Sequence, residues 1–156
     1  MKEYIASDGT KFKCEYSYKE HQNVLNTKSA LEKIRMSKNI IYHNNLEHLT
    51  PPFFPDSYLD IDEYISIAYC YYFTPVNKDG IKEANSFLEA IVDSNNTYLN
   101  TDYDCQDLTE KDINETIIAS FDEDLKFIEA RKIISFKKEF QCFFDVLTNE
   151  INQRRG

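Results

Sequence analysis

Hydrophobic and polar residues alternate close to the start of the chain and then change to a helical spacing. Residues 3–6 and 11–18 predict two short strands, because an Asp-Gly turn between two β-prone runs is a strong hairpin signal. The apolar residues of 21–38 recur at the spacing of a helix with a modest apolar face. Residues 40–42 have the composition of a further short strand.

The middle of the chain mixes strand-like composition with helical patterns. Residues 64–73 are rich in Ile and Tyr, which suits a buried strand, but the residues before them resemble a helix start. Both interpretations stay open, and the start signal favours a helix. Residues 80–93 place their apolar side chains on one face and predict a clear helix. Residues 95–107 are polar and predict a loop.

Helical patterns dominate the last third of the sequence. Thr109 and Asp112 have the spacing of a helix start, which predicts a helix ending near Ser120. Residues 122–154 predict a helix throughout, with a break or kink near 133–135. The apolar stripe of this helix steps by four, three, four and four residues through Phe136, Phe140, Phe143, Leu147 and Ile151.

These elements predict an α+β fold that is mostly α, with a small N-terminal β-hairpin packed on a helical bundle. The chain of 156 residues is the size of one ordinary domain, so we expect a single domain over 1–156. Its 42% of hydrophobic and 29% of charged residues are typical of a globular protein.

Acidity is concentrated in the middle of the chain. Residues 51–130 carry 18 acidic and 4 basic side chains, a net charge of −14, whereas the whole chain has −9. A field of this sign repels phosphate backbones, so we expect no direct nucleic-acid binding. The same field attracts a basic protein surface and accelerates the encounter with it.

Metal, cofactor and catalytic motifs are not recognisable. The four cysteines are dispersed and lack the clustering that a zinc site needs, and the carboxylates around 102–112 lack the glycine and the spacing of an EF-hand loop. His43 and His48 are five residues apart and do not match the zinc helix motif. We therefore expect no metal, no cofactor and no enzyme activity. The N-terminal residues form no apolar signal region, and no run approaches 18 apolar residues, so we expect a cytosolic chain with reduced thiols.

Tyrosine is unusually frequent, with 11 residues in the chain. The run from Tyr69 to Phe73 is interpreted as core with a wet rim, in preference to an anchor for a partner. Tyr98 and Tyr103 lie among Asn and Asp, so both are expected to be exposed and to act as anchors.

Residues 4–12, followed by a charged helix, resemble the N-terminal hairpin and helix of many small bacteriophage and mobile-element proteins. The resemblance covers about the first 25 residues. It departs at Lys13-Cys14, where those proteins often have an acidic residue, and it carries over no catalytic residue. It implies a phage or mobile-element origin, and such genomes encode small acidic inhibitors of host defence nucleases, some of which imitate nucleic acid.

The leading hypothesis is a non-enzymatic inhibitor, of the anti-CRISPR type, that binds a basic nucleic-acid-handling protein in the cytoplasm of a bacterial host. Three alternatives stay open: a toxin-immunity protein, a small enzyme with a scattered carboxylate, His or Cys site, and a self-associating helical module. The oligomeric state is left open. The predicted partner contacts are Asp56, Asp60, Asp62, Glu63, Tyr98, Asp102, Tyr103, Asp104 and Asp107.

Overall fold

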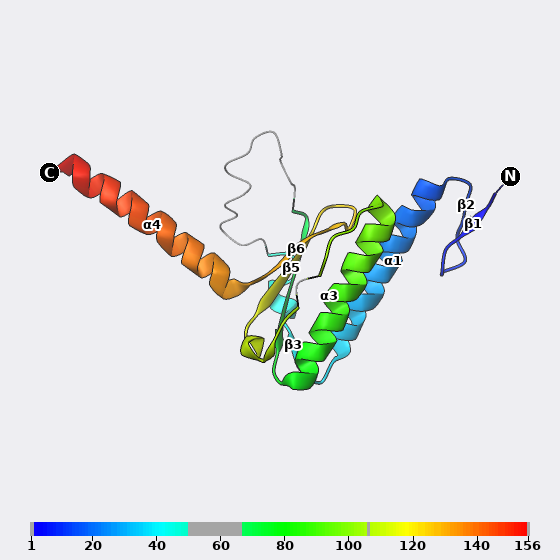
Figure 1. Cartoon of the computed structure of the whole chain (residues 1–156), viewed down its shortest axis with the longest axis horizontal. Helices are drawn as coiled ribbons and strands as arrows, with labels where there is room; N and C mark the ends of the chain where they lie inside the picture. The colour runs from blue at the N-terminus through cyan, green and yellow to red at the C-terminus, as the bar shows by residue number, and fades with distance from the viewer. Residues whose placement is uncertain (1, 50–66, 106, 156) are drawn as a thin grey trace.

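A four-stranded antiparallel sheet with two long helices on one face forms the body of the protein (Figure 1). The computed structural model describes residues 2–49, 67–105 and 107–155. The strand order is β3-β4-β5-β6, and each strand pairs with the next one along the chain. The strands are β3 (Ile40–Tyr42), β4 (Tyr69–Pro75), β5 (Ile117–Phe121) and β6 (Phe127–Lys132), and the covering helices are α1 (Glu15–Met36) and α3 (Lys78–Leu99).

The main core lies between the sheet and the two helices. The two helices contact each other along their lengths and run in opposite directions (Figure 1). Phe73 and Phe121 are fully buried at the centre of this core, and Phe87 of α3 meets Phe73 edge to face. A smaller cluster of Cys70, Tyr72 and Ile118 is buried on the opposite face of the sheet. The α+β class is therefore confirmed.

The sheet corrects the helix predicted over 64–73, of which residues 64–66 lie outside the described residues. From Tyr69 the chain forms β4, whose side chains from Cys70 to Pro75 are all buried. A strand buried on both faces is apolar at every position, so it lacks the two-residue alternation that identifies a strand in a sequence. The aromatic run accordingly serves the core, as the preferred interpretation of these tyrosines predicted.

Two further helix predictions in the last third are wrong. The Thr109–Asp112 capping box exists, but it starts only a 3-10 turn, η3 (Glu110–Asp112), and β5 follows. The helix predicted over 122–154 begins only at Ile133, close to the expected break, because the residues before it form β6. The helix that remains is α4 (Ile133–Arg155).

The N-terminal hairpin is confirmed with shorter strands. β1 (Tyr4–Ile5) pairs with β2 (Lys11–Phe12) around a turn in which Gly9 has a φ of 88°. The second strand stops at Phe12, and α1 starts at Glu15, earlier than predicted. β3 is present as predicted, and the 3-10 turn η1 (Asn44–Leu46) follows it. Helix α3 continues to Leu99, so the predicted loop starts later than residue 95.

The hairpin is tethered to α1 by Asp8, which yields a pH prediction. Its carboxylate accepts a bond from the Thr10 N–H at 3.0 Å and lies 2.8 Å from His21 Nε2. These contacts, with the Thr10 backbone bond as the largest cause, lower the pKa of Asp8 from 3.8 to about 2. A lowered carboxyl pKa stabilises the folded tether above pH 3.8 and loses that effect as the pH falls through 2. We expect the Thr10 amide resonance to shift with a midpoint near pH 2, and Asp8→Asn to abolish that shift. A midpoint at or above the ordinary carboxyl value would contradict the tether.

Candidate partner-binding surface

A loop of residues 100–109 follows α3 and is clamped along that helix by two asparagines. Asn96 accepts a bond from the Tyr103 N–H at 3.2 Å and donates to the Tyr103 carbonyl oxygen at 2.9 Å. Asn85 binds Leu108 in the same two-way manner, at 2.7 and 3.0 Å. The two asparagines are 11 residues apart, about three helical turns, so they share one face of α3. The backbone of the loop is thus held to α3 at Tyr103 and at Leu108.

Acidic side chains gather on this loop and on the helix beside it. Asp102, Asp104 and Asp107 are exposed on the loop, as predicted. Glu89 and Asp93 are exposed on α3 between the two asparagine clamps. We call these five residues the acidic strip.

Both segments of the acidic strip lie close to the thiol of Cys105. Burial raises the pKa of Cys105 most, and the negative charges of Asp107, Glu89 and Asp93 raise it further. One loop carboxylate and two helix carboxylates therefore act on the same thiol. None of the five carboxylates of the acidic strip forms an ion pair with another residue that the structure describes. Their field is therefore not cancelled by a direct cationic partner there.

The two predicted tyrosine anchors have different positions. Tyr103 is 69% exposed, and its backbone is held by Asn96, so its ring is presented at the surface beside the acidic strip. Tyr98 is only 4% exposed, and its predicted exposure is wrong. Its hydroxyl lies 2.9 Å from the Tyr16 hydroxyl and donates to Glu20 at 3.2 Å, while burial is the largest cause of its raised pKa. Tyr98 therefore joins the end of α3 to α1.

The other predicted contacts, Asp56, Asp60, Asp62 and Glu63, lie outside the described residues. Among the described ones, sequence reasoning missed the helix half of the strip. Glu89 and Asp93 are four residues apart, and Asn85 and Asn96 flank them at the spacing of the same helix face. This spacing was visible in the sequence, but the helix was expected to stop before Asn96.

A cavity of about 620 Å³ opens between the loop, α3 and β6. Asp104 and Asp107 line it from the loop, and Arg131 and Lys132 line it from the strand. Lys132 is neutralised by a bond of 2.9 Å to Asp112. Burial alone would raise the pKa of Asp112, but the bonds from Thr109 and Lys132 lower it below its ordinary value. Asp112 is thus a structural ion-pair partner.

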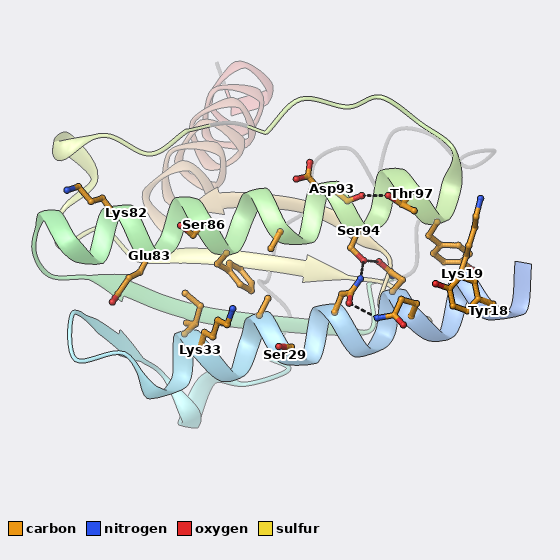
Figure 2. Close-up of a pocket in the computed structure, with 18 residues that line it drawn as sticks. Tyr18, Lys19, Ser29, Lys33, Lys82, Glu83, Ser86, Asp93, Ser94 and Thr97 are labelled. Atoms are coloured by element: carbon orange, nitrogen blue, oxygen red, sulfur yellow. Dashed lines mark hydrogen bonds between the residues drawn. The ribbon is translucent and has the colours of Figure 1, made fainter. Parts of the chain in front are cut away.

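A second cavity of about 840 Å³ forms a groove between α1 and α3 on the side away from the sheet (Figure 2). Ser94 lies in its wall, donates to Asn23 Oδ1 at 2.7 Å and accepts from Asn26 at 3.1 Å. Ser29 and Ser86 line the same groove from opposite helices. These hydrogen bonds between Asn23, Asn26 and Ser94 connect α1 to α3 along the groove.

The enzyme alternative requires a pocket in which an Asp or Glu side chain lies within hydrogen-bond reach of a His or Cys side chain. Two histidines have carboxylate neighbours: His21 lies 2.8 Å from Asp8, and His48 lies 3.6 Å from Glu47. Neither pair lines the two cavities just described. Within residues 2–49, 67–105 and 107–155, no group of three or more His, Cys, Asp or Glu side chains could hold a metal ion.

No family model, curated protein or solved structure matches the chain. None of the helices in the described part of the chain has both the length and the hydropathy that crossing a membrane requires.

Proposed function

We propose that the chain is a non-enzymatic inhibitor that binds a basic, nucleic-acid-handling protein through the acidic strip. The observation that carries the proposal is the set of five exposed carboxylates on two adjacent segments, none paired with a described cation. Uncompensated surface charge of one sign steers an oppositely charged protein and suppresses partners of the same sign.

Rigidity of the loop supports the same proposal. Binding costs less free energy when the contacting segment is ordered before the encounter. The clamps of Asn85 and Asn96 hold the backbone of Tyr103 and Leu108, so the backbone next to Asp102, Asp104 and Asp107 needs little ordering. Tyr103 supplies an exposed ring of low conformational entropy next to the charges, the residue type often found at interface hot spots.

The partner is expected to bind nucleic acid with the surface that meets the strip. Carboxylates on the inhibitor occupy the positive groove in which phosphates otherwise lie, so binding and nucleic-acid occupancy compete. The resemblance of the N-terminal hairpin and helix to small phage proteins makes a bacterial defence nuclease the first partner to test.

Neutralising the loop carboxylates together is expected to abolish capture of this partner. The variant Asp102→Asn, Asp104→Asn and Asp107→Asn removes three charges at nearly constant volume, and we expect about 100-fold weaker binding at roughly 1 kcal/mol per charge. The immobilised chain is presented with the heparin-retained fraction of a bacterial lysate, and bound proteins are identified by mass spectrometry at rising salt. Wild-type capture should decline steeply between about 0.05 and 0.5 M NaCl, because the Debye length shortens.

A matched control removes the same charge elsewhere. Glu3, Glu123 and Asp124 are exposed outside the strip, so Glu3→Gln, Glu123→Gln and Asp124→Asn should retain the wild-type partners. Proteins captured equally by wild type and by the strip variant, or captured without salt dependence, would overturn the proposal. Added duplex DNA should also displace the partner from the immobilised wild-type chain.

A further inference from the structure

Helix α4 extends away from the body of the protein (Figure 1). Its contacts with the body lie at its beginning beside β6, where the Ile133 N–H donates to the Thr116 carbonyl oxygen at 2.9 Å. The helix has 23 residues, which corresponds to a length of about 35 Å. In Figure 1 the rest of the helix projects away from the sheet and from α1 and α3.

The apolar side chains of α4 that the structure describes are exposed. Phe144, Leu147 and Ile151 are between 41% and 45% exposed, and Ile133 is 44% exposed. These four residues are separated by 11, 3 and 4 positions, which places them on one face of the helix. Helices in proteins derive most of their stability from packing such a face. The face of α4 is thus suited to contact with another surface.

We propose that this face binds the same face of α4 in a second copy of the chain, with the two helices antiparallel. A two-fold pair of this kind uses one self-complementary patch on both copies. Specific interfaces bury at least about 1,200 Å² in total, so the contact must extend along most of the helix. The described apolar residues of this face lie at both ends of that length, at Ile133 and from Phe144 to Ile151.

Charge decides the direction of the pair. Each chain carries −9, whereas residues 131–156 carry 6 basic and 3 acidic side chains and are net positive. In a parallel pair the two acidic bodies would lie side by side and repel each other. In an antiparallel pair the bodies lie at opposite ends of a contact about 35 Å long, several Debye lengths apart at physiological salt. Each basic helix end, with Arg154, then approaches the acidic body of the other copy.

Leu147→Glu is expected to convert the dimer into a monomer, because it places a charge within the apolar face. Light scattering at 10–200 µM should give twice the chain mass of 18.4 kDa for wild type and one chain mass for the variant. Asn149→Glu adds the same charge two positions away, on the opposite side of α4, and should leave the dimer intact. Unchanged thermal unfolding of the body would show that both variants are folded.

Two outcomes would overturn the self-association. The first is a wild-type monomer at 200 µM, and co-sedimentation of that monomer with anionic phosphatidylserine vesicles would show that the face of α4 binds lipid instead. The second is a dimer that persists in Leu147→Glu. Mild oxidation of Arg154→Cys tests the relative direction of the two α4 helices. Parallel helices bring the two new thiols together and give a disulfide-linked dimer. Antiparallel helices keep the two thiols about 30 Å apart. A disulfide-linked dimer that forms in oxidised Arg154→Cys but not in oxidised wild type would contradict the antiparallel arrangement.

This self-association is independent of the proposed function. The strip variant should stay dimeric, and Leu147→Glu should still capture the basic partner, so the failure of one proposal leaves the other to be judged by its own experiment.

Discussion

Replacing Gly80 by alanine is expected to lower the free energy of unfolding by at least about 2 kcal/mol, the cost of overpacking a tight contact. A Cβ at this position would lie 2.2 Å from the Asn39 carbonyl oxygen and 3.3 Å from the Pro75 Cα. Both neighbours are backbone atoms, and the Asn39 oxygen already accepts a bond from the Val76 N–H at 3.0 Å. Relief of the clash therefore requires the first turn of α3 to move away from the ends of β3 and β4.

The sign of this effect makes the test decisive. At an ordinary helix position, replacing glycine by alanine stabilises a protein by roughly 0.5–1 kcal/mol. Ser86→Ala, on the exposed face of the same helix, is the control and should be neutral or slightly stabilising. Urea unfolding of wild type and both variants gives the comparison. A Gly80→Ala protein as stable as wild type would show that α3 and β3 do not approach as closely as described.

Local signals were sufficient for the first third of the fold and for α3. The hairpin was predicted from its Asp-Gly turn, and β3 from its apolar triplet. Helix α3 was predicted from its amphipathic face, although its end was placed too early, because two adjacent asparagines suggest a loop. Asn95 is buried and accepts a bond from the Phe127 N–H, a tertiary contact that the sequence does not reveal.

For β4 the sequence left strand and helix open and favoured helix, and β5 was predicted as helix, for a physical reason. β4 and β5 are central strands whose described side chains are nearly all buried, so their apolar runs resemble segments of a buried helix. The capping box of Thr109 and Asp112 was a true local feature, but tertiary pairing with β4 and β6 ended the helix after one turn. Non-local strand pairing overrode the local preference.

The acidic strip was predicted in part. Charge counting identified the loop carboxylates, and exposure was correct for Tyr103 because its neighbours along the chain are polar. The predicted exposure was wrong for Tyr98, because its packing partners, Tyr16 and Lys126, are distant in the sequence. The clamps by Asn85 and Asn96 also join segments that the sequence alone does not bring together.

Replacing Asn23 by alanine is expected to destabilise the protein by about 3 kcal/mol, because the change leaves a cavity and unsatisfied buried polar groups. The Asn23 side chain is 2% exposed, donates to the Leu125 carbonyl oxygen at 3.2 Å and accepts from Ser94 at 2.7 Å. It thus joins α1 to α3 and to the β5–β6 turn, where Leu125 has a φ of 58°. This left-handed conformation is unfavourable for a branched side chain, so the turn depends on such contacts.

A double-mutant cycle with Ser94→Ala tests whether the three elements are joined through one network. The two substitutions remove the same hydrogen bond, so their combined effect on unfolding should be smaller than the sum by about 1 kcal/mol or more. Thr97→Ala, one turn further along the exposed edge of the groove, serves as the control and should be additive with Asn23→Ala. Hydrogen exchange at the Leu125 amide, which donates to Asp122 at 3.1 Å, should accelerate in Asn23→Ala well beyond the global loss of stability. Strict additivity of Asn23 and Ser94, with an unchanged turn, would mean that the helices and the turn are held by the apolar core alone.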